Sequence, residues 1–330
     1  CAMLITGIMM GAAWAYESLT FGGYWAWDPV ENASLVPWLV LLAGLHTQVV
    51  YNATGHSLRA TYLFLILGFV LVLYSTFLTR SGILGDTSVH AFVGSGMDLQ
   101  LILFILVFFI PAIILYIVNY RNIPHIKKEE NTWSREFWMF IGSLVIFLSS
   151  IFICIATSLP VINKLFGTSW STGDDPKFSY NRIEIFIAII LGLLTATVQY
   201  LKYKNTSKSY FLKKLWPATA IALVISVCIS AFGGIHYTEY GTGYLAAIHL
   251  ALFGGVYSFV ANAGYIFTGL KGKIRASGPS VAHAGFGILL VGILISSAKQ
   301  EVLSINTTGI NLPFDPKSKQ NPLENITLLK

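Results

Sequence analysis

The sequence has little charge. Asp, Glu, Lys and Arg together make up 11% of its 330 residues, whereas 55% of the residues are hydrophobic and the mean hydropathy is +0.68. Soluble domains carry a charge on about a quarter of their residues. This shortage excludes a soluble globular domain and predicts an integral membrane protein, whose solvent is the bilayer.

Cysteine is also scarce. Of the three cysteines, Cys1 is the first residue, and Cys154 and Cys228 lie inside apolar runs. None belongs to a C-x-x-C pair followed by histidine, the pattern that attaches c-type haem. We therefore expect this chain to carry no c-type haem of its own. A glycine-rich phosphate loop, a zinc pattern and a nucleophile beside a base are also missing, so an ATPase or a hydrolase is not supported.

Long apolar runs recur along the chain instead. A helix needs roughly 20 apolar residues to cross roughly 30 Å of hydrocarbon. This requirement predicts an all-α, polytopic transmembrane bundle with about nine spans. The expected spans are 1–16, 34–51, 61–79, 99–118, 136–159, 183–201, 215–235, 244–268 and 279–298.

The two ends of the sequence suggest that it is an internal fragment. It begins inside an apolar run, without an initiator Met or the basic flank of a signal peptide. We expect one transmembrane domain, 1–298, followed at 299–330 by the start of an extracytoplasmic C-terminal segment.

The basic residues favour one orientation. Nine spans place successive loops on alternate sides, and cytoplasmic loops are enriched in Lys and Arg. Residues 17–33, 80–98 and the segment after 298 are therefore expected outside, and the net charge of +6 needs no nucleic-acid partner. The cations expected inside are Arg59, Arg121, Lys127, Lys128, Arg135, Lys202, Lys204, Lys208, Lys213, Lys214, Lys271, Lys273 and Arg275.

An aromatic loop is the most distinctive segment on the expected outer side. It reads TFGGYWAWDPVENASLVPW and carries four aromatic residues close together: Phe21, Tyr24, Trp25 and Trp27. The rings could form an aromatic belt at the membrane surface. They could also bind a large planar apolar ligand such as porphyrin, since Gly22-Gly23 is flexible and Asp28-Pro29 forces a turn. Asp28, Glu31 and Asn32 are also common at helix starts, and for Glu31 and Asn32 we expect capping.

Two histidines lie inside the expected spans. His46 is about five residues, and His283 about four, from the cytoplasmic end of its span. At 1.5 Å per residue, both lie roughly 6–8 Å below the inner surface, so they could face each other. Two imidazoles on opposite faces of one iron hold a b-type haem. The alternative is that each histidine makes a hydrogen bond between helices.

A third histidine, His90, lies in an outer loop ten residues after Arg80. A loop histidine can simply be solvated. On the same side as the aromatic loop, it could also be an axial ligand of a haem resting on those rings. Arg80 could then pair with a haem propionate.

The aromatic loop resembles the "WWD" signature, W-G-x-x-W-x-W-D, of the haem-handling superfamily that contains the CcmC, CcmF and CcsA families. The continuation DPVENASLVPW is similar to the CcmF family and its nitrite-reductase-specific relatives. So are TFLTRSGILGDTSVHAF at 76–92, GLHTQVVY around His46 and VAHAGFGILLVGI around His283. Phe21 and Tyr24 stand where that family usually has Trp, which keeps the rings but removes the indole N–H.

The resemblance implies two haem sites. His46 and His283 would hold a b-type haem in the membrane that passes an electron outward. A transient substrate haem would rest at the outer face of the 17–38 region, where Trp25, Trp27 and Asp28 shape the site and His90 is a ligand. The family's other outer ligand lies upstream of the signature and has no counterpart in this sequence.

The resemblance also implies an activity and partners. It predicts a haem lyase subunit in the bacterial inner membrane, with the loop facing the periplasm, that forms thioether bonds between haem and C-x-x-C-H cysteines. The implied partners are a CcmE-like haem carrier, apocytochrome c, CcmH-like subunits and membrane lipid. Two alternatives are a CcmC- or CcsA-like haem shuttle, which loads a carrier, and a haem-free transporter.

Overall fold

The structure is a computed structural model that describes residues 1–18, 23–85, 87–88, 96–127, 130–173, 175–235 and 240–298. Throughout these residues the regular elements are helices, and they include no strand. In chain order the helices are α1 (Ala2–Ser18), α2 (Pro29–Thr54), α3 (Leu58–Arg80), α4 (Asp98–Asn119), α5 (Arg135–Thr157), α6 (Leu159–Phe166), α7 (Pro176–Thr197), η1 (Val198–Tyr200), α8 (Lys208–Phe232), α9 (Thr242–Thr268), η3 (Ile274–Ala276) and α10 (Gly278–Ala298).

Eight helices of the described chain are long and apolar enough to cross a membrane. They are α2, α3, α4, α5, α7 with η1, α8, α9 and α10. The expected all-α membrane bundle is confirmed, but the ninth expected span, 1–16, is not among them. All but the first of those residues, expected as a truncated span, lie in α1, which has 17 residues.

Helix α7 begins earlier than expected, at Pro176 rather than at 183. The Asp175 side chain accepts a hydrogen bond from the backbone N–H of Phe178 at 2.9 Å, and Pro176 occupies the first turn. Both features favour a helix start. The extra turns carry polar residues, so a search for apolar spans does not include them.

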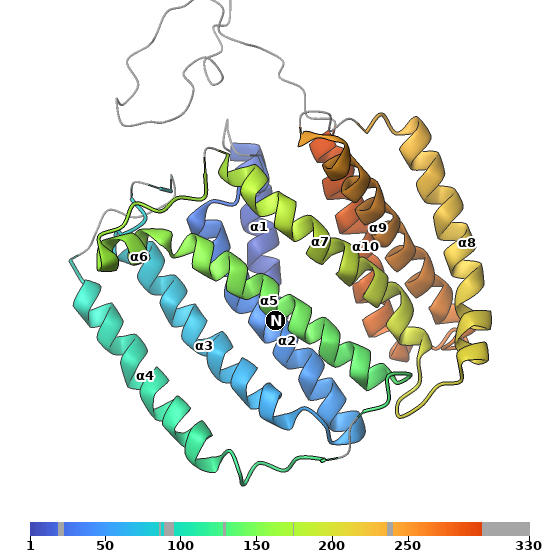
Figure 1. The fold of residues 1–330 in the computed structure, drawn as a ribbon, viewed down its shortest axis with the longest axis horizontal. Coiled ribbons are helices and arrows are strands. Elements are labelled where there is room, and N and C mark those ends of the chain that lie inside the picture. Colours follow the sequence, from blue (N-terminus) through green and yellow to red (C-terminus); the bar gives the residue numbers. More distant parts are fainter. Residues whose placement is uncertain are drawn as a thin grey trace, which may run out of the picture.

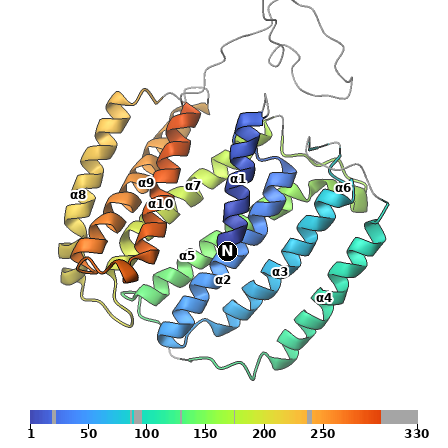
Figure 2. The same cartoon turned by 180° about the vertical axis from the view of Figure 1, so that it is seen from behind.

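The helices form two groups. In one, α2 packs against α3 and α5, and in the other, α9 packs against α7, α8 and α10. The contact between α5 and α7 joins the groups, and α4 and α8 lie at opposite edges of the bundle (Figures 1 and 2). Both views show α1 between α2 and α10, with α8 to α10 on one side and α2 to α4 on the other.

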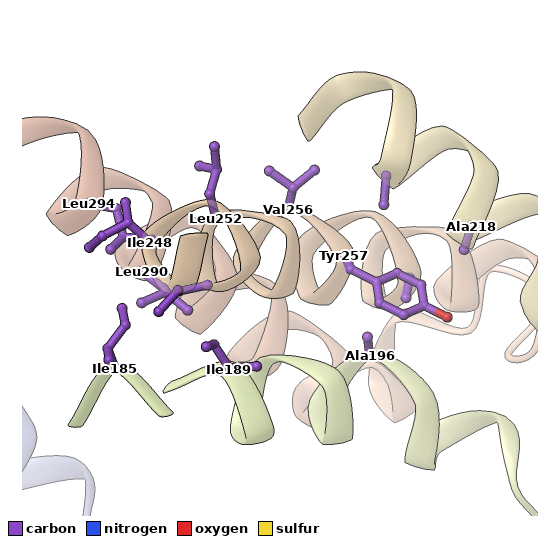
Figure 3. Close-up of a cluster of buried hydrophobic side chains, with 14 of the residues drawn as sticks. Ile185, Ile189, Ala196, Ala218, Ile248, Leu252, Val256, Tyr257, Leu290 and Leu294 are labelled. Atoms are coloured by element: carbon purple, nitrogen blue, oxygen red, sulfur yellow. The ribbon is translucent and has the colours of Figure 1, made fainter. Parts of the chain in front are cut away.

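The largest buried cluster surrounds α9 (Figure 3). Leu252 is fully buried there, and apolar side chains of α7, α8 and α10 pack along α9. Lipid is as apolar as these side chains, so close packing of small residues, rather than exclusion of water, brings membrane helices together. Glycines supply that close approach, because Gly192 of α7 lies against Gly254 of α9, and Gly287 of α10 lies against Gly255.

Replacing Gly287 with alanine should separate α10 from α9. A Cβ atom at Gly287 would lie 2.5 Å from the carbonyl oxygen of Gly255 and 2.7 Å from the backbone nitrogen of Phe259. Overpacking of this kind costs about 1–3 kcal/mol. Gly285→Ala on the same helix is the control, because nothing lies within 4 Å of its Cβ position. Unfolding in detergent by increasing SDS, followed by circular dichroism, measures both, and equal stability of the two variants would contradict the packing argument.

Hydrogen bonds show which loops share an end of the bundle. Tyr24 shares a hydrogen bond of 2.9 Å with Ser296 near the end of α10, and the Ser88 hydroxyl donates to Asp28 at 2.7 Å. The segments expected outside therefore meet at one end, as far as they are described. His90, Phe21 and residues 299–330 lie outside the described residues.

Candidate functional site

Trp27 is held firmly in the aromatic loop. Its ring lies parallel to that of Tyr180 on α7, with centroids 5.0 Å apart and an angle of 6°. Its indole N–H donates to the Asn181 side-chain oxygen at 2.7 Å, and Trp25 packs edge-on at 6.0 Å. The backbone φ of Trp27 is 57°, a conformation uncommon for residues other than glycine, which persists where surrounding contacts hold it. One face of Trp27 is therefore occupied by protein.

The turn after Trp27 is a helix cap. The Asp28 carboxylate accepts from the Val30 N–H at 2.9 Å, and the Glu31 carboxylate accepts from the N–H groups of Ala26 and Asp28 at 2.9 and 3.1 Å. This reciprocal pattern is a capping box, so capping by Glu31 is confirmed. Capping by Asn32 is wrong: its buried amide donates to the Trp27 carbonyl at 2.9 Å and binds the loop to α2.

The loop contacts both helix groups. Tyr24 reaches Ser296 and Ser297 of α10, at 2.9 and 3.4 Å, while Trp27 contacts α7. Trp27 also packs on a buried cluster formed by Val36 of α2, Ile153 of α5 and Tyr180. The aromatic loop is thus a structural part of the bundle and not a loose surface belt.

His46 and His283 come together inside the membrane-spanning region. Their ring centroids are 6.2 Å apart and their planes differ by 11°. His46 Nδ1 donates to the Leu42 carbonyl at 2.8 Å, which leaves Nε2 as its electron-pair donor. Their helices, α2 and α10, do not pack closely against each other elsewhere in the described chain.

The separation of the two rings matches that of two axial ligands of one metal. Metal–imidazole bonds are about 2 Å long and the ring centre lies about 1 Å further, so two axial imidazoles have centroids roughly 6 Å apart. The carbonyl hydrogen bond on the other nitrogen is also the usual way that a ligating histidine is oriented.

Arg80 ends α3 at the same end of the bundle as the aromatic loop, and its side chain is exposed. Its predicted contact with a propionate, like the predicted roles of His90 and Phe21, stays a prediction. The residues that the sequence reasoning missed are Tyr180, Asn181, Ser296 and Ser297. Their signal was weak, because a Tyr-Asn pair before an apolar run and a Ser-Ser pair after one are both common.

The described residues form an all-helical membrane protein, and part of the chain resembles cytochrome c assembly proteins. Residues 1–84 match the family model described as "Cytochrome C assembly protein". Over 305 residues the chain is 33% identical to the cytochrome c-type biogenesis protein CcmF of Pseudomonas fluorescens, covering 90% of this chain and 44% of that protein. The chain is therefore similar to CcmF proteins over 90% of its length.

Two further matches agree. The cytochrome c-type biogenesis protein NrfE of Haemophilus influenzae is 49% identical over 106 residues, which are 31% of this chain and 16% of that protein. A solved structure titled "Cytochrome c Heme Lyase CcmF" superposes with a TM-score of 0.61 at 23% identity, covering 89% of this chain and 43% of that one, and shows the same fold. The chain spans just under half the length of the curated relatives that it matches over most of its own length.

Proposed function

We propose that this chain is the haem-binding membrane part of a cytochrome c haem lyase, which attaches haem covalently to C-x-x-C-H motifs of apocytochrome c. The observation that carries the proposal is the pair His46 and His283, whose ring centroids lie 6.2 Å apart in the same bundle that holds the aromatic loop. Neither a plain aromatic belt nor two separate helix–helix hydrogen bonds accounts for that pairing.

His46 and His283 hold a b-type haem on this proposal. The Leu42 carbonyl orients the His46 ring and favours the tautomer with a free Nε2. Since α2 and α10 belong to different helix groups, a haem between them would also join the two groups. The bound haem would supply one-electron redox chemistry, which a helical bundle of ordinary side chains lacks.

The outer site takes haem as a substrate. Because Tyr180 covers one face of Trp27, we assign Trp27 to holding the loop in place and Trp25 to contact with the substrate. Phe21 and Tyr24 contribute further rings on this proposal, His90 supplies an axial ligand and Arg80 pairs with a propionate. Asp28 acts through the cap that it forms on α2.

The reaction is an addition. Each cysteine thiol adds across a vinyl group of the substrate haem: one C–S bond and one C–H bond form, while the S–H bond and the vinyl π bond break. No atom leaves. The reactive groups belong to the haem and the apocytochrome, so the protein's contribution is to position the vinyl groups toward the thiols.

The partners and location follow from the same proposal. A CcmE-like carrier delivers haem, apocytochrome c receives it, and CcmH-like subunits assemble with the protein. The aromatic loop and the 299–330 segment face the periplasm from the bacterial inner membrane. The Lys- and Arg-rich loops at the opposite end support this orientation.

A complementation experiment tests the activity. The full-length protein that contains this chain is expressed in a bacterium lacking its own CcmF. We expect restored covalent haem on a C-x-x-C-H cytochrome, detected as haem-dependent peroxidase stain after denaturing electrophoresis. Haem loaded on the carrier but absent from the cytochrome would instead indicate a shuttle. A membrane-inserted protein with neither product would overturn the proposal.

A further inference from the structure

A basic pocket lies at the end of the bundle opposite the aromatic loop. The start of α5, the end of η1, the start of α8 and the end of α9 meet there, at the lower right of Figure 1. The cavity has a volume of about 260 Å³. Its lining includes three cations, Arg135, Lys202 and Lys214, and four tyrosines, of which Tyr210 and Tyr265 matter here.

Arg135 is the fixed part of the pocket. Its guanidinium donates to the Leu201 carbonyl at 2.8 Å, to the Gln199 carbonyl, and to the Tyr265 hydroxyl at 3.2 Å. These donors are Nε and Nη2, and no described residue accepts a hydrogen bond from Nη1. Because Tyr265 accepts from Arg135, its own phenolic hydrogen can be donated to a ligand.

Two lysines complete the basic lining. The backbone carbonyl of Lys202 accepts from the Arg135 N–H at 3.0 Å, so the two residues are held side by side. The Lys202 ammonium lies 4.4 Å from the centre of the Tyr210 ring. Lys214 is exposed on the first turns of α8. Both lysines can therefore direct charge toward the cavity without breaking an ion pair.

No carboxylate is among the described residues that line this cavity. The neighbouring Glu136 is 3% exposed, and its carboxylate accepts hydrogen bonds from the Lys204 N–H at 2.8 and 3.0 Å. That carboxylate is directed into the protein. The cavity thus holds three positive charges with no described negative charge in its lining, which is the composition of an anion site.

The surrounding surface indicates where that anion comes from. Trp216 on α8 and Phe267 on α9 are 69% and 74% exposed, at nearly the same depth as Lys214 and Tyr265. In a membrane-spanning bundle, exposed rings at this level face lipid, and Trp is typical of the interface. The cations therefore lie where the hydrocarbon ends and phospholipid headgroups begin.

We propose that this pocket binds the phosphate group of an anionic phospholipid. The phosphate would accept hydrogen bonds from Arg135 Nη1 and the Tyr265 hydroxyl, and its charge would be balanced by Lys202 and Lys214. Basic pockets between transmembrane helices bind such headgroups in other proteins. A bound lipid would link α5, η1, α8 and α9 at this end, independently of the haem proposal.

The test is native mass spectrometry of the full-length protein released from nanodiscs. The test variant is Lys202→Ala/Lys214→Ala, and the control is Lys208→Ala/Lys213→Ala, which removes the same charge outside the lining. Arg135 is left intact because it also holds the end of α7 and η1. Circular dichroism and size-exclusion chromatography confirm that each variant is folded.

We expect the unmodified protein and the control to retain phosphatidylglycerol in preference to phosphatidylcholine. In the test variant, the amount of retained phosphatidylglycerol should fall at least ten-fold. Equal loss in both double variants would mean diffuse charge attraction and would overturn the site. Equal retention of the two lipids would overturn it as well. Inorganic phosphate is the second probe: if it binds at this site while phosphatidylglycerol does not, the source is free phosphate and the lipid proposal fails.

Discussion

Replacing His46 or His283 with alanine is expected to abolish membrane-bound b-type haem while leaving insertion intact. The two rings lie 6.2 Å apart, and each would provide one of two iron ligands. Even loss of a residue that only supports a metal ligand typically costs 10–100-fold in metal affinity, so loss of a ligand itself should cost more. A pyridine haemochrome assay and visible spectrum of the full-length protein, purified in detergent, measure the haem per protein.

His249→Ala provides the matched control. This histidine also lies in a membrane-spanning helix, but its Nδ1 is 2.9 Å from the Ser230 hydroxyl of α8, as expected for a helix–helix hydrogen bond. Its haem content should equal that of the unmodified protein. Normal haem in both His46→Ala and His283→Ala would contradict the assignment. An unmodified protein with no haem, despite adequate supply and an intact fold, would instead favour a haem-free transporter.

The proximity of His46 and His283 illustrates what the sequence could predict. A helix rises 1.5 Å per residue, so the distance of a residue from the end of its span sets its depth. That argument placed the two histidines at one depth, and their observed proximity agrees with it. The sequence could not show that α2 and α10 bring these histidines together, because that depends on packing through α5, α7 and α9. Ligation itself stays a prediction.

The surroundings of Trp27 illustrate what the sequence could not predict. Tyr180 and Asn181 are more than 150 residues away along the chain, and their helix begins with polar residues that an apolar search passes over. Local contacts are easier to predict from the sequence. The capping box of Asp28 and Glu31, for example, involves residues that are close together in the chain.

Trp27→Ala is expected to disable the outer site and spare the inner haem. The substitution removes a stacked ring pair, worth about 0.5–1.5 kcal/mol, and a hydrogen bond to Asn181, worth about 0.5–1.5 kcal/mol. It also leaves a positive φ without the contacts that hold it. The loop should then sample other conformations, and covalent haem on the reporter cytochrome should fall at least ten-fold while the b-type spectrum is unchanged.

Two further variants separate the contributions of Trp27. Trp27→Phe keeps a ring for Tyr180 but loses the N–H, and Asn181→Leu removes the acceptor while leaving Trp27 intact. If the hydrogen bond orients the loop, both variants should lower the covalent attachment of haem to the reporter cytochrome to a similar, intermediate extent. If stacking alone holds it, both stay near the unmodified level. Loss of the b-type spectrum together with attachment in Trp27→Ala would show that the loop only stabilises the bundle, because Trp27 also packs on the cluster that joins α2, α5 and α7.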